Sequence, residues 1–285
     1  MARLESGVAI PELLAEATTA LMAWNPETAR RTAARILGDL LGTTPAALQL
    51  DRTRTVGLND AGKFLDQVRQ VAAGAPLEHV TGYAGFRHLA LRSDARALIP
   101  RPETEGLVGL VLERIDRGTV ADIGTGSGAI ALALAEEGGF DVVIGVDSAA
   151  DALALARENA ARTGLRIELV EGHLASPLAT GRFDAVVSNP PYLTASEYAA
   201  LDPAVREHEP RAALESGADG LAATRELLDD ARRVLHPGGW LALEVDATRG
   251  DRTRTLAEAF GWHGAAIHLD LFGRERYLLA QRSER

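Results

Sequence analysis

Apolar residues recur at helical spacing over the first eighty residues. In the segments 10–21 and 33–41 they stand three or four positions apart. Such spacing places the apolar side chains on one face of a helix. Asn59 is predicted to cap a third helix, because another apolar run at this spacing follows it. Residues 1–80 are therefore predicted to form a small helical domain.

The period of the pattern changes after this domain. Apolar residues alternate with others from Tyr83 to Leu91, which is the pattern of a short hairpin. Gly82 and Gly85 are interpreted as its turn residues. The segment 81–102 is therefore predicted to be a hairpin that connects two domains.

In the rest of the chain, segments typical of strands and of helices alternate. This order predicts an α/β domain over residues 103–285, in which helices cover both faces of a doubly wound, mostly parallel sheet. A helix is expected to start near Thr104. The other predicted elements are strands at 120–123, 142–146, 167–170, 183–188, 240–245 and 276–281, and helices at 129–137, 149–163 and 221–235.

Composition excludes several classes of function. Hydrophobic residues make up 46% and charged residues 25% of the chain, as in an ordinary globular protein. The formal net charge is −10, which argues against direct binding of nucleic acid, since neutralising phosphates requires a basic surface. The chain has no cysteine, so disulfides, cysteine-ligated metals and cysteine nucleophiles are excluded. No metal site is predicted.

Neither a membrane span nor an export signal is predicted. The apolar stretch 123–135 lacks charges but is shorter than the roughly 20 residues that a spanning helix needs. Acidic residues interrupt the apolar positions near the N-terminus, unlike those of a signal peptide. The predicted location is the cytoplasm.

A glycine-rich loop joins a predicted strand to a predicted helix. Glycines at such a junction let the backbone turn sharply and approach a ligand without a Cβ clash. A tight turn without a ligand is the alternative interpretation. The loop consists of Gly124, Thr125, Gly126, Ser127 and Gly128.

Asp147 ends the next predicted strand. A carboxylate at this point of an α/β unit can accept hydrogen bonds from both ribose hydroxyls of a nucleoside. Enzymes that use nicotinamide cofactors and methyltransferases that use S-adenosylmethionine share this feature. Asp147 could instead cap the helix that follows.

The motif Asn189-Pro190-Pro191-Tyr192 directly follows the predicted strand 183–188. Two prolines force the chain out of the sheet at the strand's carboxyl end, which is where ligands bind in open parallel sheets. The Asn189 side-chain oxygen and the Pro190 carbonyl could each accept one hydrogen of a planar –NH2 group, and Tyr192 offers an aromatic face. These four residues are the candidate substrate site.

This arrangement suits methylation of an amide nitrogen. The lone pair of an amide is delocalised, and fixing both hydrogens would turn it toward an electrophilic methyl group about 3–3.5 Å away. The proton can leave after transfer, so no strong base is needed. The candidate catalytic residues are Asn189, Pro190 and Tyr192, and a rigid turn is the alternative interpretation.

Five motifs together resemble those of class I methyltransferases that use S-adenosylmethionine, and more closely those of the HemK/PrmC family of release factor glutamine methyltransferases. The resemblance extends over nearly the whole chain. The motifs are Ile99-Pro-Arg-Pro-Glu-Thr-Glu105, Asp122-Ile-Gly-Thr-Gly-Ser-Gly128, Asn189-Pro-Pro-Tyr192, Glu209-Pro-Arg-Ala-Ala-Leu214 and Asp270-Leu-Phe-Gly-Arg274.

The resemblance implies a seven-stranded methyltransferase sheet and S-adenosylmethionine as the cofactor. It also implies peptide chain release factors as partners, methylated on the glutamine of their Gly-Gly-Gln motif and docked on the helical domain. The glycine loop would contact the methionine part of the cofactor, Asp147 its ribose and Leu174 its adenine, and Asn189 would touch both cofactor and substrate. His173, Asp246 and Arg249 depart from the family pattern.

Other functions remain open at this stage. The same clamp would fit the amino group of a nucleic-acid adenine, or a glutamine of a ribosomal protein. The glycine loop and Asp147 would also fit a nicotinamide-dependent oxidoreductase, although Lys63 is the only lysine and lies in the helical domain. A further alternative is a binding module that keeps affinity for the cofactor but lacks activity.

Overall fold

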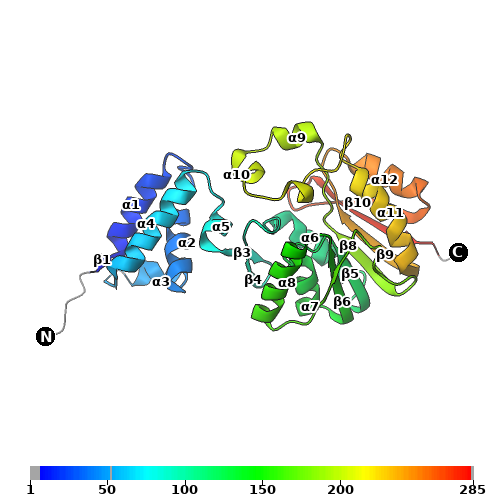
Figure 1. Cartoon of the computed structure of the whole chain (residues 1–285), viewed down its shortest axis with the longest axis horizontal. Helices are drawn as coiled ribbons and strands as arrows, with labels where there is room; N and C mark the ends of the chain where they lie inside the picture. Colours follow the sequence, from blue (N-terminus) through cyan, green and yellow to red (C-terminus); the bar gives the residue numbers. More distant parts are fainter. Residues whose placement is uncertain (1–6, 52, 284–285) are drawn as a thin grey trace. The chain divides into compact units, whose positions relative to one another are not determined.

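The computed structural model describes residues 7–51 and 53–283 (Figure 1). The chain forms two compact units. The first comprises residues 1–82 and 203–208, and the second comprises residues 83–202 and 209–285. Residues 1–6 and 52 of the predicted helical domain lie outside the described residues.

The first unit is a helical bundle with one two-stranded β-pairing. The helices of residues 10–21, 29–41 and 58–72 bury their apolar faces in a common core, as the helical spacing predicted. The unit's elements are β1 (Val8–Ala9), α1 (Ile10–Leu21), α2 (Ala29–Leu41), α3 (Pro45–Leu50), β2 (Thr55–Val56), α4 (Leu58–Ala72), α5 (Leu77–Thr81) and α10 (Pro203–Arg206).

The prediction that Asn59 caps the third helix is wrong. Helix α4 begins at Leu58 after Gly57, and no side chain makes a capping hydrogen bond there. Asn59 therefore lies in the first turn, one position past the start of the helix. Asp60 in the same turn places a negative charge at the positive end of the helix dipole.

A β-hairpin opens the second unit, but its turn is not where the glycines predicted it. Strands β3 (Tyr83–Phe86) and β4 (Leu89–Arg92) are antiparallel and joined at Arg87. Gly85 lies inside β3, and Gly82 ends α5 in the left-handed region. Arg87 itself adopts a φ of 51°, and its backbone N–H donates to Glu105 Oε1 at 3.1 Å. Its guanidinium also pairs with the Glu137 carboxylate, so contacts with distant residues fix a turn that lacks glycine.

The second unit is built on a seven-stranded sheet with the order β10-β11-β9-β8-β5-β6-β7. All neighbours pair in parallel except those of β11, which runs against β9 and β10. The predicted doubly wound, mostly parallel sheet is confirmed. The unit's remaining elements are α6 (Pro102–Leu112), β5 (Arg117–Ile123), α7 (Ala129–Glu137), β6 (Gly139–Asp147), α8 (Ala150–Thr163), β7 (Glu168–Glu171), β8 (Phe183–Ser188), α9 (Ala195–Ala199), η1 (Arg211–Ala213), α11 (Ala222–Val234), β9 (Leu235–Glu244), α12 (Gly250–Ala259), β10 (Trp262–Leu269) and β11 (Glu275–Arg282).

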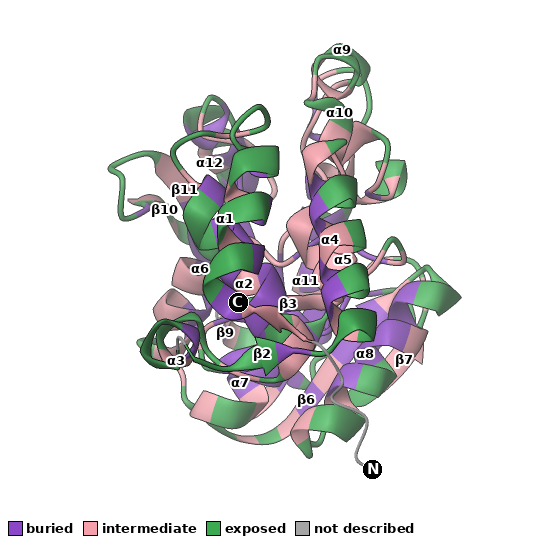
Figure 2. Cartoon of the chain, turned by 90° about the vertical axis from the view of Figure 1, so that its left-hand side faces the viewer, coloured by how far each residue is buried: buried purple, intermediate pink, exposed green. Residues whose placement is uncertain are grey.

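Alternate residues of the central strands enter two separate apolar cores. On β8, Ala185 and Val187 pack with α6 and α7, whereas Val186 packs with α11 and α12 on the other face. This period of two is what a sheet covered on both sides requires. Figure 2 shows buried and exposed residues on opposite sides of helices such as α8. Among the described residues, no helix has the length and apolar character needed to cross a bilayer.

The strand order reverses between β5 and β8. From β5 the chain continues outward through β6 to β7, and from β8 it continues the other way to β9. The carboxyl ends of the two strands lie side by side, since Ile123 pairs with Ser188. Such a reversal leaves a crevice at the strand ends, which is the usual ligand site of open α/β sheets.

Candidate active site

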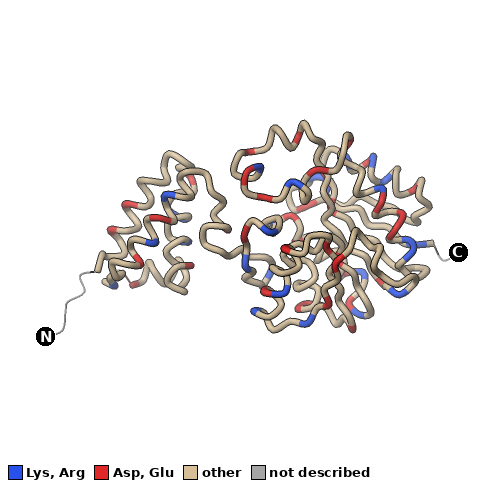
Figure 3. The backbone as a smooth tube through the Cα atoms, viewed as in Figure 1, with Lys and Arg blue, Asp and Glu red and all other residues tan. Residues whose placement is uncertain are grey.

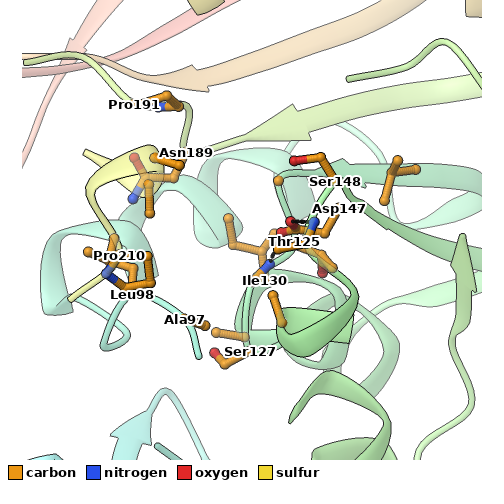
Figure 4. A pocket seen from close by; sticks show the side chains of 18 of the residues that line it. Ala97, Leu98, Thr125, Ser127, Ile130, Asp147, Ser148, Asn189, Pro191 and Pro210 are labelled. Atoms are coloured by element: carbon orange, nitrogen blue, oxygen red, sulfur yellow. Dashed lines mark hydrogen bonds between the residues drawn. The ribbon is translucent and has the colours of Figure 1, made fainter. Parts of the chain in front are cut away.

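A cavity of about 260 Å³ lies at the carboxyl ends of β5, β6 and β8 (Figure 4). In that view, Asn189 and Pro191 lie on one side of the cavity and Asp147 and Ser148 on the other, with Ile130 between them. Its walls come from the segment before α6, the glycine loop, the end of β6, the loop after β7, the start of the segment after β8, and residues near η1. The elements that converge here are far apart in the sequence, and every lining residue belongs to the second unit.

The glycine loop is held open by its backbone. Gly124, Gly126 and Gly128 all have positive φ, of 71°, 54° and 83°. The N–H groups of Gly124 and Thr125 both donate to the Val146 carbonyl, at 2.8 and 2.9 Å, and so anchor the loop to β6. A Cβ atom on Gly124 would meet nothing within 4 Å. Because Gly124 lines the cavity, this free space is available to a ligand.

Not every glycine of the loop faces the cavity. Gly126 and Ser127 line it, together with Gly124 and Thr125. Gly128 does not, and a Cβ on it would lie 3.3 Å from the Cβ of Ala156. Its role in the structure is close packing between α7 and α8, which differs from the cofactor contact predicted for the whole loop.

Asp122 holds the glycine loop through hydrogen bonds and was not among the predicted site residues. It is fully buried, and its Oδ2 accepts hydrogen bonds from Thr125 Oγ1 at 2.6 Å and from the Ala131 N–H at 3.1 Å. Its Oδ1 accepts no hydrogen bond from the described residues. Burial raises the pKa of Asp122 to about 7. Its position at the end of a strand, directly before the loop, was the available sequence signal.

Asp147 closes the cavity wall opposite Asn189. Its Oδ2 accepts a hydrogen bond from the Gly126 N–H, and its Oδ1 accepts one from the Ala149 N–H, both at 2.9 Å. A carboxylate oxygen can accept more than one hydrogen bond, so both oxygens keep capacity for ligand hydroxyls. Asp147 therefore holds the loop and faces the cavity. The alternative prediction that it caps the next helix is wrong, because the N-cap of α8 is Ala149 and no side chain makes a capping hydrogen bond there.

The loop after β7 contributes Leu174 and His173. Leu174 lines the cavity with a φ of 47°, a conformation that costs a branched residue energy and is kept only where the surroundings fix it. The His173 side chain is 71% exposed, and its Nε2 lies 2.9 Å from Glu226 Oε2. His173 also lines the cavity, and its contact with Glu226 of α11 lies at the surface.

The segment after β8 leaves the sheet at Asn189. Ser188 Oγ donates to the Ile123 carbonyl at 2.6 Å and so ties the end of β8 to the end of β5. Asn189 and Pro191 line the cavity, whereas Pro190 is buried and neither it nor Tyr192 belongs to the lining. The predicted four-residue site is thus contiguous, with two of its residues at the cavity surface and two behind it.

Asn189 is held by a buried chain of polar groups that the sequence did not predict. Its Nδ2 donates to Thr104 Oγ1 at 3.2 Å, and Thr104 Oγ1 donates to Glu244 Oε2 at 2.6 Å. Tyr192 Oη lies 3.5 Å from the other oxygen, Glu244 Oε1. None of the described residues donates a hydrogen bond to Asn189 Oδ1. This oxygen is therefore available to a donor in the cavity.

Three ion pairs fix segments next to the cavity, one at Glu209 and two at Arg249. Glu209 is buried, and it accepts hydrogen bonds from the Ile99 N–H at 3.0 Å and from Arg101 Nη2 at 2.6 Å. Asp246 and Arg249, two of the positions that depart from the family pattern, pair with each other at 3.0 Å. Arg249 also binds Glu197 of α9 at 2.6 Å, which fixes the segment that follows the Asn-Pro-Pro-Tyr motif.

The cavity fits S-adenosylmethionine. Apolar side chains offer contacts for a flat ring, the Asp147 carboxylate offers acceptors for ribose hydroxyls, and the open glycine backbone admits a polar tail. Leu98, Ile130 and Leu174 are among the apolar lining residues. Among the described residues, no group of three or more His, Cys, Asp or Glu side chains could hold a metal ion.

The sheet order, the glycine loop after β5 and the acidic residue at the end of β6 define the class of the protein. It has the fold of class I methyltransferases that use S-adenosylmethionine. A crystal structure of a methyltransferase from Pyrococcus furiosus matches this fold with a TM-score of 0.53 at 19% identity, covering 79% of this chain and 98% of that one.

Sequence comparisons then give the family. Residues 104–207 match the family model of the methyltransferase small domain, and residues 12–82 match that of the PrmC N-terminal domain. The release factor glutamine methyltransferase of Deinococcus radiodurans is 40% identical over 95% of this chain and 98% of its own length. That of Moorella thermoacetica is 39% identical over 96% and 98%. The chain belongs to the release factor glutamine methyltransferase family, as the sequence motifs predicted, and is an S-adenosylmethionine-dependent methyltransferase.

Proposed function

We propose that this enzyme methylates the side-chain amide nitrogen of the glutamine in the Gly-Gly-Gln motif of peptide chain release factors. The relatives named above carry this substrate class in their names. The observation that supports it most strongly is the free Asn189 Oδ1 at the cavity surface, on the wall opposite Asp147. An oxygen there accepts a hydrogen bond from an incoming –NH2 group.

The clamp orients the substrate amide. In the proposed clamp, Asn189 Oδ1 accepts one N–H at the cavity surface, and the carbonyl of the buried Pro190, next to it in the chain, accepts the other. The nitrogen lone pair, perpendicular to the plane of the –NH2 group, then points away from both acceptors. When bound, S-adenosylmethionine supplies an electrophilic sulfonium methyl group. With the cofactor bound, the nitrogen would take this methyl group as the carbon–sulfur bond breaks, and the bonding pair would stay on sulfur. Fixed orientation of this kind supplies much of the rate enhancement.

Tyr192 lies behind the cavity surface, where its hydroxyl donates toward Glu244, and it has no role as a base. Burial raises the pKa of its hydroxyl above the ordinary value, so the group stays protonated. No base is needed before transfer, because the nitrogen loses its proton only after it has become positively charged.

The cofactor contacts are assigned from the lining residues. We place the methionine part along Gly124, Gly126 and Ser127, the ribose at Asp147 and the adenine against Leu174. The helical unit is assigned to docking of the release factor. A cytoplasmic location follows from the sequence as a prediction, and cell fractionation tests it.

The amino group of a nucleic-acid adenine would fit the same clamp. The net charge of −10 argues against this substrate, and acidic and basic residues are interspersed along the backbone (Figure 3). Family membership removes the nicotinamide oxidoreductase and the inactive binding module from consideration. A glutamine of a ribosomal protein remains the competing protein substrate.

Mass spectrometry of purified substrates tests the proposal. The enzyme is incubated with S-adenosylmethionine and an intact release factor, in parallel with a release factor whose Gly-Gly-Gln glutamine is changed to alanine. We expect a gain of one methyl group on that glutamine and none in the altered protein. Methylation at another site, or only of duplex DNA or ribosomal proteins, would overturn the assignment.

A further inference from the structure

The polar chain behind Asn189 is more deeply buried than the residue it holds. Glu244 is 2% exposed and Thr104 is 4% exposed. They come from the end of β9 and the first turn of α6, two elements separated by 140 residues at this contact. Burying a carboxyl group is costly unless its oxygens receive hydrogen bonds. Here one oxygen faces the Thr104 hydroxyl and the other faces the Tyr192 hydroxyl.

The direction of each hydrogen bond from Asn189 through Thr104 to Glu244 is set by the Glu244 carboxyl group. Burial raises the pKa of Glu244. The ionised carboxylate only accepts, so with Glu244 ionised the single hydroxyl hydrogen of Thr104 points to it. The Thr104 oxygen is then left as an acceptor toward Asn189. It can be satisfied only by the –NH2 end of the Asn189 amide, at 3.2 Å. The oxygen end, Oδ1, must consequently face the opposite way.

We infer that Thr104 and Glu244 are positioning residues that determine which end of the Asn189 amide meets the substrate. This inference rests on the proposed function, in which Asn189 Oδ1 accepts an N–H of the target glutamine. A reversed amide would present its own –NH2 to the substrate –NH2, and two donors cannot form a hydrogen bond. The carboxylate thus acts on the reaction through two intervening groups without touching the substrate.

Tyr192 depends on the same carboxylate. Its hydroxyl lies 3.5 Å from Glu244 Oε1, so one buried group orients both polar side chains of the Asn-Pro-Pro-Tyr motif. Glu244 reaches both side chains because β9 pairs with β8, the strand that the Asn-Pro-Pro-Tyr motif follows.

The test uses the full chain and two variants with a similar shape. Thr104→Val removes the hydroxyl, and Glu244→Gln introduces an –NH2 group that can donate to Thr104 and reverse the chain. We expect each to lower kcat/KM for the release factor by about 10- to 100-fold. The Kd for S-adenosylmethionine by calorimetry should change by less than about twofold, since neither change alters the glycine loop or Asp147.

Thr104→Ser supplies the rescue. It keeps the hydroxyl and should retain at least half of the wild-type kcat/KM. Thr253→Val is the matched control, because Thr253 is a buried threonine of α12 that donates only to the Arg249 carbonyl. A role limited to stability would lower Tm in both valine variants and leave T104V and T253V with the same kcat/KM.

Two results would show that Thr104 and Glu244 do not position the Asn189 amide. Wild-type turnover in both T104V and E244Q would overturn the inference. The inference would also be overturned if T104V lowered both kcat/KM and Tm and if T104S restored neither of them. If T104V fails to fold, E244Q decides alone.

Failure of the inference and failure of the proposed function give different results. If the variant N189A is inactive while T104V and E244Q turn over normally, only the positioning role is wrong. If wild-type enzyme leaves the release factor glutamine unmethylated, the proposed function itself is wrong.

Discussion

The two sides of the cavity are built in different ways. The glycine-loop side is made of backbone, with three glycines of positive φ and a carboxylate that holds one of their N–H groups. The Asn189 side is made of side chains, and its hydrogen bonds join residues 85 and 140 positions apart. The first side depends on a local run of sequence, whereas the second depends on the completed fold. Substitutions on the glycine-loop side should therefore raise the Kd for S-adenosylmethionine, whereas substitutions on the Asn189 side should lower turnover.

Gly124→Val should have the largest effect on the backbone side. A valine at a φ of 71° is strained, and its side chain would fill cavity space that is now open. We expect the Kd for S-adenosylmethionine to rise at least about 100-fold in calorimetry. Gly181→Val is the control, since Gly181 also has positive φ and no neighbour within 4 Å but does not line the cavity. Equal affinity in both variants would contradict the comparison.

Asp147→Asn should weaken the cofactor by a smaller amount. The amide can still accept the Gly126 N–H but loses the charge that strengthens hydrogen bonds from ribose hydroxyls. We expect about a tenfold higher Kd, equal to loss of about 1.4 kcal/mol. Asp141→Asn, an exposed position on the same strand, should leave the Kd unchanged. An unchanged Kd for the Asp147 variant would remove this residue from the cofactor site.

Arg249→Met tests the side-chain side. It releases Glu197 and Asp246, so turnover should fall about 3- to 10-fold while affinity for S-adenosylmethionine stays the same. The backbone N–H of Thr194 and the Arg249 guanidinium lower the pKa of Glu197 to about 2. That carboxyl stabilises the fold above its unfolded pKa of about 4.3, and the stabilisation is lost as pH falls toward 2.

The fall in Tm between pH 5 and pH 3 should therefore be smaller in R249M than in the wild type. Arg254→Met is the matched control, because Arg254 lies on the exposed side of the same helix and pairs only with Asp251 and Glu258 among the described residues. The same acid response in R249M and wild type would contradict the account of this ion pair.

His236→Gln should have the smallest effect, a small change in the pH dependence of Tm. It should change neither turnover nor affinity for the cofactor. The Pro237 carbonyl and the Asp184 carboxylate raise the pKa of His236. The stabilisation is present below the unfolded pKa of about 6.5 and is lost as pH rises through the higher folded value. From pH 6 to pH 8 the wild-type Tm should fall by about one or two degrees more than that of the variant. A change in turnover would show that the sheet's far end is coupled to the site.

The sequence predicted the elements whose apolar pattern is strong. Strand 183–188 and helix 129–137 have the predicted bounds, and both bury most of their residues. Strand β10 and helix α12 were missed. Strand β10 contains two histidines and a glycine with a register shift, and α12 buries only Gly250, Thr253 and Ala257. Their place in the fold depends on packing against β11, which no local pattern records.

The same division applies to the site. Gly124 to Ser127, Asp147, Leu174 and Asn189 were predicted from the sequence, and the structure brings them to one cavity, whereas Gly128 packs against Ala156. Thr104 lies in the motif of residues 99–105 and Glu244 at the end of a predicted strand, but nothing in either segment shows that the two side chains meet. Their contact exists only because α6 packs beside β9 in the folded protein.

Single-turnover methyl transfer by the Asn189→Ala variant tests the central claim most directly. The rate of methylation of the release factor glutamine is measured at saturating S-adenosylmethionine, and the cofactor Kd is measured on the same sample. The amide clamp predicts a rate about 100- to 1,000-fold below that of the wild type, with the Kd changed by less than about threefold. A rate near that of the wild type would contradict it.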